Sequence, residues 1–123
     1  MTLAEIKQAV MFQTDNDRND LGDFMPFLLG YINEGYDRLL YVWKKEHVQP
    51  GTDYEPLTND ADQPVLPLWS HNAIVDWATY MIYRNGNGMK QQRGMAYRTS
   101  FQEIRARLID DRVTDRKIIN IPH

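Results

Sequence analysis

The chain has 123 residues, no cysteine and a net charge of −3, with 42% hydrophobic and 25% charged residues. This length and composition are those of one folded domain, and the lack of cysteine excludes disulfides and thiolate metal sites. No apolar run approaches the roughly 18 residues of a membrane-spanning helix, and the first residues lack a secretory signal pattern, so we expect a protein made in the cytoplasm, with no membrane partner.

The charge is divided unevenly along the chain. Up to residue 83, five Lys/Arg stand against thirteen Asp/Glu, and after it nine stand against four. An acidic front and a basic back fit nucleic acid on the basic part, copies stacked front to back, or simply two differently solvated surfaces. The charge pattern alone does not decide among the three.

The first expected element is a short amphipathic helix over residues 2–13. Thr2 and Glu5 have the spacing of a capping box. The apolar residues that share one face are Leu3, Ile6 and Val10. This spacing predicts a core-facing helix, followed by a polar connecting loop over residues 14–20.

The second expected helix covers residues 23–46 and is the longest. Pro26 fits its first turn, where a missing N–H is harmless. Gly30 and Gly35 lie inside it at a cost of about 1 kcal/mol each relative to alanine. We therefore expect another helix to cross closely at both glycines; the alternative is an exposed face without such contacts. Its apolar stripe carries Phe24, Phe27, Leu28, Tyr31, Ile32, Leu39, Val42 and Trp43.

A proline-rich, acidic loop is expected over residues 47–67. Loops of this length inside a small domain are commonly binding elements, so Tyr54 and Leu57 are candidate contacts to a partner. In the alternative, these residues and residues 65–66 pin the loop to the body or form a short hairpin.

A helical hairpin is expected over residues 66–108. Its apolar residues recur at steps of three and four, first at Ile74, Trp77, Ala78, Met81 and Ile82, then at Tyr97, Phe101, Ile104 and Leu108. Between the arms, residues 85–88 (NGNG) favour positive φ and reverse the chain. Each arm presents one apolar stripe, so further helices must cover the remainder.

The sequence thus predicts an all-α fold: a bundle of about four helices in a domain of residues 1–110, with a long loop between helices 2 and 3. Residues 111–123 are expected to form an extended C-terminal tail, because the helical pattern fades and the last residues are β-prone. Such an apolar tail is expected to contact a partner or to fold back on its own subunit. Its candidate contact residues are Lys117, Ile118, Ile119 and Ile121.

The sequence offers no convergent set of catalytic residues. Its three histidines, His47, His71 and His123, fall in different segments, and His71, at a helix start, is expected on the surface. No phosphate-cradling glycine loop or nucleophile elbow is present. We therefore expect no enzyme activity, no cofactor and no metal.

The basic fourth helix offers a different function. Its residues Lys90, Arg93, Arg98 and Arg105 can contact phosphates with a salt-dependent affinity. The sequence has no short turn between helices of the kind found in helix-turn-helix motifs, which bind specific DNA sequences. A small DNA-binding accessory protein that contacts only the backbone is therefore the alternative hypothesis.

Several segments together resemble the small head–tail connector, or adaptor, proteins of tailed bacteriophages. They are a short helix and an Asp-rich loop, residues 31–35 (YINEG) in the long helix, residues 66–78 from Leu-Pro to Trp-Ala, and a fourth helix with Tyr97 and Phe101. The turn at residues 85–88 and the acidic loop before residue 67 depart from the family pattern, and they leave the attachment partner open.

The resemblance implies a structural virion protein at the head–tail interface. It implies a homo-oligomeric ring, dodecameric in relatives, that attaches beneath the portal protein and presents a surface to a tail, stopper or nozzle component. Genome DNA would pass through the lumen without being read, which makes the four basic residues of the fourth helix candidate lumen contacts. Contacts that close under rotation would form the ring.

Overall fold

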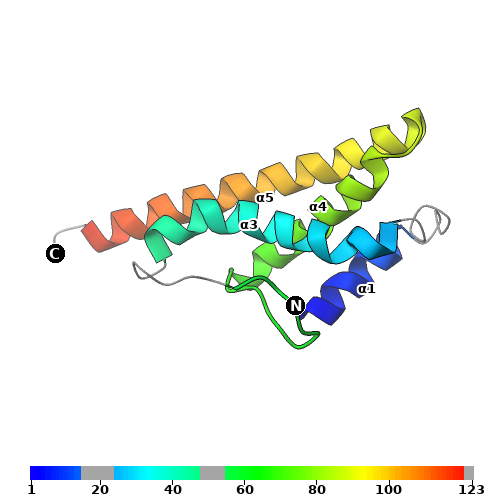
Figure 1. Ribbon diagram of the computed structural model, residues 1–123. Coiled ribbons are helices and arrows are strands. Elements are labelled where there is room, and N and C mark those ends of the chain that lie inside the picture. Colours follow the sequence, from blue (N-terminus) through cyan, green and yellow to red (C-terminus); the bar gives the residue numbers. More distant parts are fainter. Residues whose placement is uncertain (15–23, 48–54, 121–123) are drawn as a thin grey trace.

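The structure is a computed structural model that describes residues 1–14, 24–47 and 55–120, without the side chains of residues 44–47 and 111–120. This part of the chain is an all-α bundle with no strand, and a long connection separates its second and third α-helices, as expected (Figure 1). None of its helices is long and apolar enough to cross a membrane. The elements are α1 (Leu3–Gln13), η2 (Met25–Phe27), α3 (Leu28–His47), η3 (Leu68–Ser70), α4 (His71–Arg84) and α5 (Gly88–Asn120).

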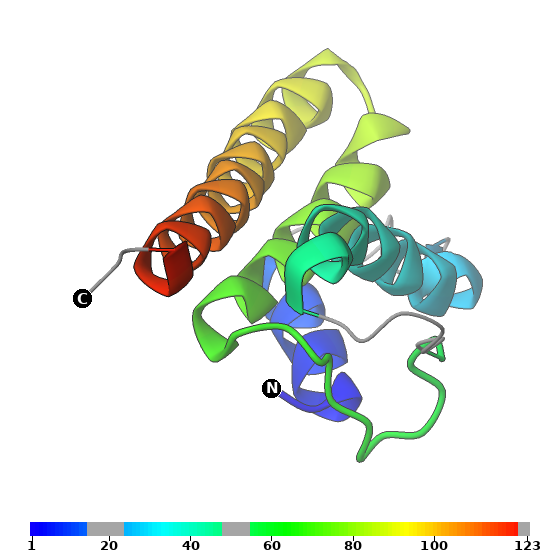
Figure 2. The same cartoon turned by 90° about the vertical axis from the view of Figure 1, so that its left-hand side faces the viewer.

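Helix α4 is the centre of the bundle. It packs against α1, α3 and α5, and Figures 1 and 2 show it crossing the nearly parallel α3 and α5. Ten of its 14 residues are buried, including the expected stripe from Ile74 to Ile82. The prediction of one apolar stripe was therefore too narrow for this arm. A helix with neighbours on several sides must be apolar on most of its circumference.

Helix α1 agrees with its sequence pattern. The Glu5 N–H donates to the Thr2 hydroxyl at 3.2 Å, and the Thr2 N–H donates to the Glu5 carboxylate at 3.0 Å, which completes the capping box. The three apolar residues of the predicted face, Leu3, Ile6 and Val10, are fully buried. Local capping and periodicity were sufficient to predict this element.

The long second helix differs from its prediction at its start. Pro26 lies in the 3₁₀ turn η2, and the α-helix begins only at Leu28. A proline has no N–H for an intrahelical bond, so a short 3₁₀ turn accommodates it before the α-helix begins. With 20 residues α3 is shorter than α5, which has 33, so the expectation that it is the longest helix was wrong.

The two glycines of α3 have different surroundings. A Cβ added to Gly35 would lie 3.0 Å from the Trp77 Cβ, so α4 does cross closely there. A Cβ added to Gly30 would meet no atom within 4 Å, and Gly30 lies on an exposed face. The predicted close crossing is confirmed at Gly35 and wrong at Gly30.

The turn between α4 and α5 uses its glycines for space. Helix α4 ends at Asn85 with φ −90°, and neither Gly86 nor Gly88 has a positive φ, contrary to the expectation. Instead, a Cβ on Gly86 would lie 2.7 Å from the Lys90 Cβ. Gly94, which the sequence did not single out, lets α5 approach α4, because a Cβ there would lie 3.0 Å from the Tyr83 Cβ.

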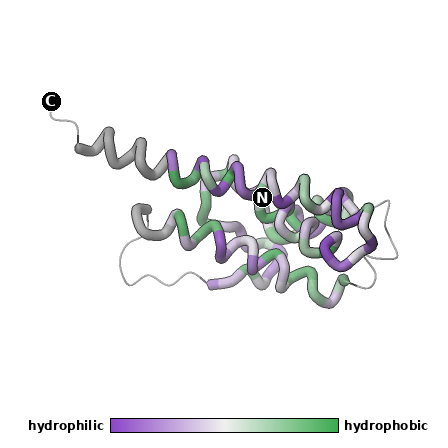
Figure 3. Tube along the Cα trace, turned by 90° about the horizontal axis from the view of Figure 1, so that it is seen from above, coloured by the Kyte–Doolittle hydropathy of each residue, from purple (hydrophilic) through white to green (hydrophobic). Residues whose placement is uncertain are grey.

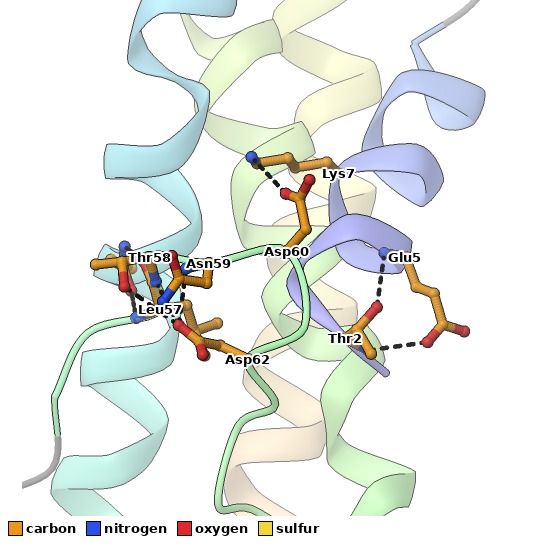
Figure 4. A network of polar contacts seen from close by, with 9 residues as sticks. Thr2, Glu5, Lys7, Leu57, Thr58, Asn59, Asp60 and Asp62 are labelled. Carbon is orange, nitrogen blue, oxygen red and sulfur yellow. Dashed lines mark hydrogen bonds and ion pairs between the residues drawn. The ribbon is translucent and has the colours of Figure 1, made fainter.

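The described part of the long loop is pinned to the body. The Leu57 N–H donates to the Asn33 side-chain oxygen at 2.8 Å, and the Asn33 amide donates to the Leu57 carbonyl at 2.9 Å. The Asp62 carboxylate accepts from the N–H groups of Thr58 and Asn59, which fixes the turn shown in Figure 4. These hydrogen bonds lower the pKa of Asp62. Pinning, rather than a hairpin, is thus the arrangement of the described loop.

The same loop caps the start of α1. The N–H groups of Leu3 and Ala4 donate to the carbonyls of Asp62 and Asp60 at 2.8 and 3.1 Å. Lys7 adds an ion pair to Asp60 at 3.3 Å (Figure 4). Free N–H groups at a helix start need acceptors, so this contact couples α1 to the loop.

Helix α5 continues beyond the predicted end of the bundle. Its backbone is helical to Asn120, so residues 117–120 are helical rather than β-like, and the expected C-terminal tail extends past the end of α3 (Figure 1). Once a helix is formed, each added residue gains a hydrogen bond, so an existing helix continues more easily than a new one starts. Along its described part, hydrophilic and hydrophobic residues are intermixed in sequence (Figure 3).

Candidate functional site

An open groove of about 620 Å³ lies between α3 and α5, with α4 at its base. Three largely buried apolar side chains contribute to it: Leu40, Trp77 and Phe101. The polar side chains that line it come from α3 and α5, and they are Asp37, Arg38, Tyr41, Arg98, Gln102 and Arg105. An apolar surface bordered by charged groups is the usual make-up of a binding site.

Helical spacing places these polar residues along the groove. Arg98, Gln102 and Arg105 follow each other at steps of four and three, which aligns them on one face of α5. Arg38 and Tyr41 are three residues apart on α3. Packing of α3 and α5 on α4 then brings the two rows to opposite sides of one groove.

The base of the groove is an aromatic cluster. The Trp77 ring lies 4.9 Å from the Phe101 ring, tilted by 49°, and 5.4 Å from the Tyr80 ring, tilted by 58°. Tilted aromatic pairs at these distances are favourable beyond the area that they bury. Close approach of Trp77 to Gly35 completes the cluster from the side of α3.

Two arginines of the groove stack on this cluster. The guanidinium carbon of Arg38 lies 4.4 Å from the centre of the Trp77 ring, and Arg38 also pairs with Glu34 at 3.3 Å. The guanidinium carbon of Arg98 lies 5.9 Å from the centre of the Tyr80 ring. Stacking restricts these side chains while leaving N–H donors that a ligand can use.

The indole N–H of Trp77 is buried and has no hydrogen-bond partner in the described part of the chain. Trp77 is only 7% exposed, so bulk water does not replace the missing acceptor. An unpaired buried donor costs about 1–3 kcal/mol and is uncommon in native structures. The Trp77 side chain at the base of the groove therefore carries an unused donor.

His71 belongs to a different, closed site at the start of α4. Its Nδ1 lies 2.8 Å from the Met1 amino group, and its Nε2 lies 2.8 Å from the Leu66 carbonyl oxygen. The side chain is 1% exposed, so the expectation of a surface histidine was wrong. Burial is the main cause that lowers its pKa. With both nitrogens occupied, the imidazole joins three segments of the fold.

Among the described carboxylates, Asp76 has the largest change in pKa. Burial raises its pKa to about 6, and a hydrogen bond from Gln13 opposes that rise. The oxygen of the same Gln13 amide lies 2.6 Å from the Thr79 hydroxyl. Gln13 thus joins the end of α1 to α4 through two polar residues.

The structure brings two of the four candidate DNA contacts into the groove. Arg98 and Arg105 line it and are half-buried, whereas Lys90 and Arg93 lie outside it, nearer the start of α5. Lys90 is half-buried and Arg93 is exposed. The four residues therefore differ in exposure and surroundings, and DNA contact stays a prediction.

The candidate partner contacts of the loop and tail have mixed positions. Leu57 is 2% exposed and belongs to the core, so its side chain offers no exposed surface for a partner. Lys117, Ile118 and Ile119 lie on the helical backbone of α5, with their side chains outside the described ones. The candidates that fall outside the described residues are Tyr54 and Ile121.

Sequence reasoning missed the groove itself. Arg38 and Tyr41 were not singled out, and Trp77 was expected only as a core residue. The spacing of the polar residues on α5 could have predicted one side of the groove. The position of α3 opposite them could not be predicted from the local sequence pattern. In the described part of the chain, no three His, Asp or Glu side chains are grouped so that they could hold a metal ion.

No family model, curated protein or solved structure gave a match to this chain.

Proposed function

We propose that this protein is a structural virion component, a head–tail connector or adaptor of a tailed bacteriophage. In this proposal it forms a ring beneath the portal protein and joins the portal to a tail or stopper component. Genome DNA passes through the lumen without being read. The main support for the proposal is that residues of the family resemblance lie at contacts between the parts of the bundle.

Three residues of the resemblance join different parts of the bundle. Asn33 makes two hydrogen bonds to the backbone of Leu57, which attach the long loop to α3. Gly35 gives room for Trp77, where α3 crosses α4. These residues determine how the helices are arranged, so a resemblance that rests on them is a resemblance in fold. A resemblance that rested on exposed residues would be one of composition only. This supports a shared architecture with the adaptor proteins.

Exposed apolar side chains at one end of the bundle also support the proposal. The end of α1 and the start of α3 meet there (Figure 1). The end of α1 exposes Phe12 at 84% and Met11 at 40%, and η2, just before α3, exposes Phe27 at 57% and Met25 at 44%. Exposed apolar side chains are candidates for contacts with another subunit, and a ring subunit needs such contacts with its neighbours.

The proposal is tested by mixing the purified protein with the portal protein encoded by the same genome. Electron microscopy of the mixture is expected to show rings of this protein attached to one end of the portal. The double variant Phe12→Ser and Phe27→Ser should remain folded, because both side chains are exposed, but should assemble poorly. Leu68→Ser, which alters a side chain that is 74% exposed in another part of the fold, is the control. Wild-type protein that neither binds the portal nor forms rings would contradict the proposal.

DNA binding is the second candidate, favoured by the exposed and half-buried cations of α5. It predicts binding of duplex DNA that weakens steeply as salt is raised, and loss of that binding in the double variant Arg98→Glu and Arg105→Glu. A flat titration at low salt would dismiss it. This outcome would leave the adaptor proposal intact, since DNA there passes through the lumen without tight binding.

A further inference from the structure

The groove between α3 and α5 has an excess of positive charge above an apolar base. Arg38, Arg98 and Arg105 line it, and Asp37 is the one carboxylate among the described lining residues. Arg98 and Arg105 are half-buried, so part of their hydration is already lost before a ligand binds. Partly desolvated arginines interact more strongly with a carboxylate than fully exposed ones.

The unpaired indole N–H of Trp77 is a second, independent observation at the same place. It lies on a residue of the groove that is more than nine-tenths buried. The described chain supplies no acceptor for it, and the nitrogen is enclosed, so an oxygen atom of a ligand can reach it only when the side chains around it move aside. The groove therefore offers an apolar surface and three cations, of which Arg38 is already paired with Glu34, and its Trp77 side chain carries an enclosed, unused donor.

We infer that this groove is a docking site for an acidic segment of a partner protein, one that presents carboxylates beside an apolar side chain. The carboxylates pair with the groove's arginines, and the apolar side chain covers the surface formed by Leu40 and Phe101. When the side chains around the Trp77 indole N–H move aside, a segment oxygen accepts from it. Pockets that combine arginine and aromatic residues are the usual centres of protein interfaces. This inference does not depend on the virion function.

The geometry favours a peptide over nucleic acid. Arg38 covers the face of the Trp77 ring at 4.4 Å, so that ring is not free to stack with a base. Asp37 would repel a nearby phosphate, whereas a peptide can place a neutral group beside it. The cations lie beside an apolar base, and a phosphodiester backbone has no group that would fill it.

The binding test uses a short fluorescein-labelled peptide in which glutamates flank a leucine and a phenylalanine. Fluorescence anisotropy should show saturable binding to the full chain at low salt, and binding of the matching glutamine peptide should be at least about tenfold weaker. Equal binding of both peptides would overturn the inference. Duplex DNA is the second probe: DNA that binds the groove more tightly than the peptide would also overturn it.

Charge reversal locates the site. Arg105→Glu should weaken peptide binding at least about tenfold. Arg84→Glu, with the same change in net charge at an exposed position outside the groove, should bind like the wild type. Circular dichroism checks that both variants remain folded. If Arg105→Glu does not fold, Gln102→Glu provides the same charge test at an exposed position of the groove. Equal weakening by Arg84→Glu would overturn the inference.

The Trp77 indole provides a direct readout of the site. In a nitrogen-15 spectrum of the protein, its N–H resonance is assigned by its absence in Trp77→Phe. Peptide binding should shift this resonance downfield, since the N–H gains an acceptor, while the indole resonances of Trp43 and Trp69 should move less. A peptide that binds and leaves the Trp77 resonance unmoved occupies another surface, and the inference would then be wrong.

Discussion

The two sides of α4 differ in how completely their polar groups are used. Toward α1 and the loop, His71 has partners at both nitrogens, and Thr79 and Asp76 share Gln13. Toward α3 and α5, the Trp77 indole has no partner in the described chain, and the arginines of the groove are half-buried or exposed. One helix therefore borders both a closed polar network and an open groove in which one hydrogen-bond donor lacks a partner.

This difference separates stability from binding. A closed network rigidifies a fold when each of its members is satisfied. A surface whose donors and charges lack partners within the fold contributes little to the free energy of folding, and these groups can bind another molecule. Substitutions on the closed side should therefore mainly change the free energy of unfolding, while those in the groove should mainly change binding.

The largest difference is expected between Ile6→Ala and Arg105→Ala. Ile6 is fully buried on the closed side, and its truncation should lower the free energy of unfolding by about 2–5 kcal/mol. Arg105→Ala in the groove should change it by less than about 0.5 kcal/mol. Urea denaturation of both variants measures the difference. Similar losses in both would remove the distinction between the two sides.

A pair of glycine variants tests the crossing of α3 and α4. Gly35→Ala should lower the free energy of unfolding by about 1–3 kcal/mol, because the new methyl group would lie 3.0 Å from the Trp77 Cβ. Gly30→Ala should raise it by about 0.5–1 kcal/mol, since its surroundings are open and alanine favours the helix. Thermal or urea unfolding separates the two, and equal signs would contradict the assigned crossing.

Asn33→Asp tests how the loop is attached. The aspartate can still accept from the Leu57 N–H, but it cannot donate to the Leu57 carbonyl. We expect a loss of about 1–2 kcal/mol in the free energy of unfolding. Faster hydrogen exchange of the Leu57 amide is the local readout. Asn72→Asp, at an exposed position, is the control and should be nearly neutral. Unchanged exchange in Asn33→Asp would show that the loop is held in another way.

The smallest effect expected is that of Asp76 on the pH dependence. Its pKa is raised from 3.8 to about 6 in the fold, so the folded state binds more protons than the unfolded state between these values. The free energy of unfolding therefore falls as pH rises from about 4 to about 6. Allowing for its partial exposure, Asp76→Asn should be about 1 kcal/mol more stable than the wild type at pH 7 and nearly equal near pH 4. Urea midpoints at both values measure this, and a constant difference would contradict it.

The helical elements could largely be predicted from the sequence, but their partners could not. The capping box of Thr2 and the face of Leu3, Ile6 and Val10 were predicted correctly, because both depend on residues within one or two turns. His71 was misassigned because its partner Met1, which lies 70 residues away in the sequence, reaches it only through the fold. Gly30 and Gly35 look alike in sequence, yet only Gly35 faces another helix.

By itself, the sequence determined that the chain forms helices and where its apolar faces lie, since periodicity and capping act between residues a few positions apart. Tertiary structure decided that α4 is central, that Leu57 belongs to the core, and that Arg38 lies opposite Arg98 and Arg105. These features depend on the packing of helices distant in sequence, where side-chain volume selects one arrangement among several that the same faces allow.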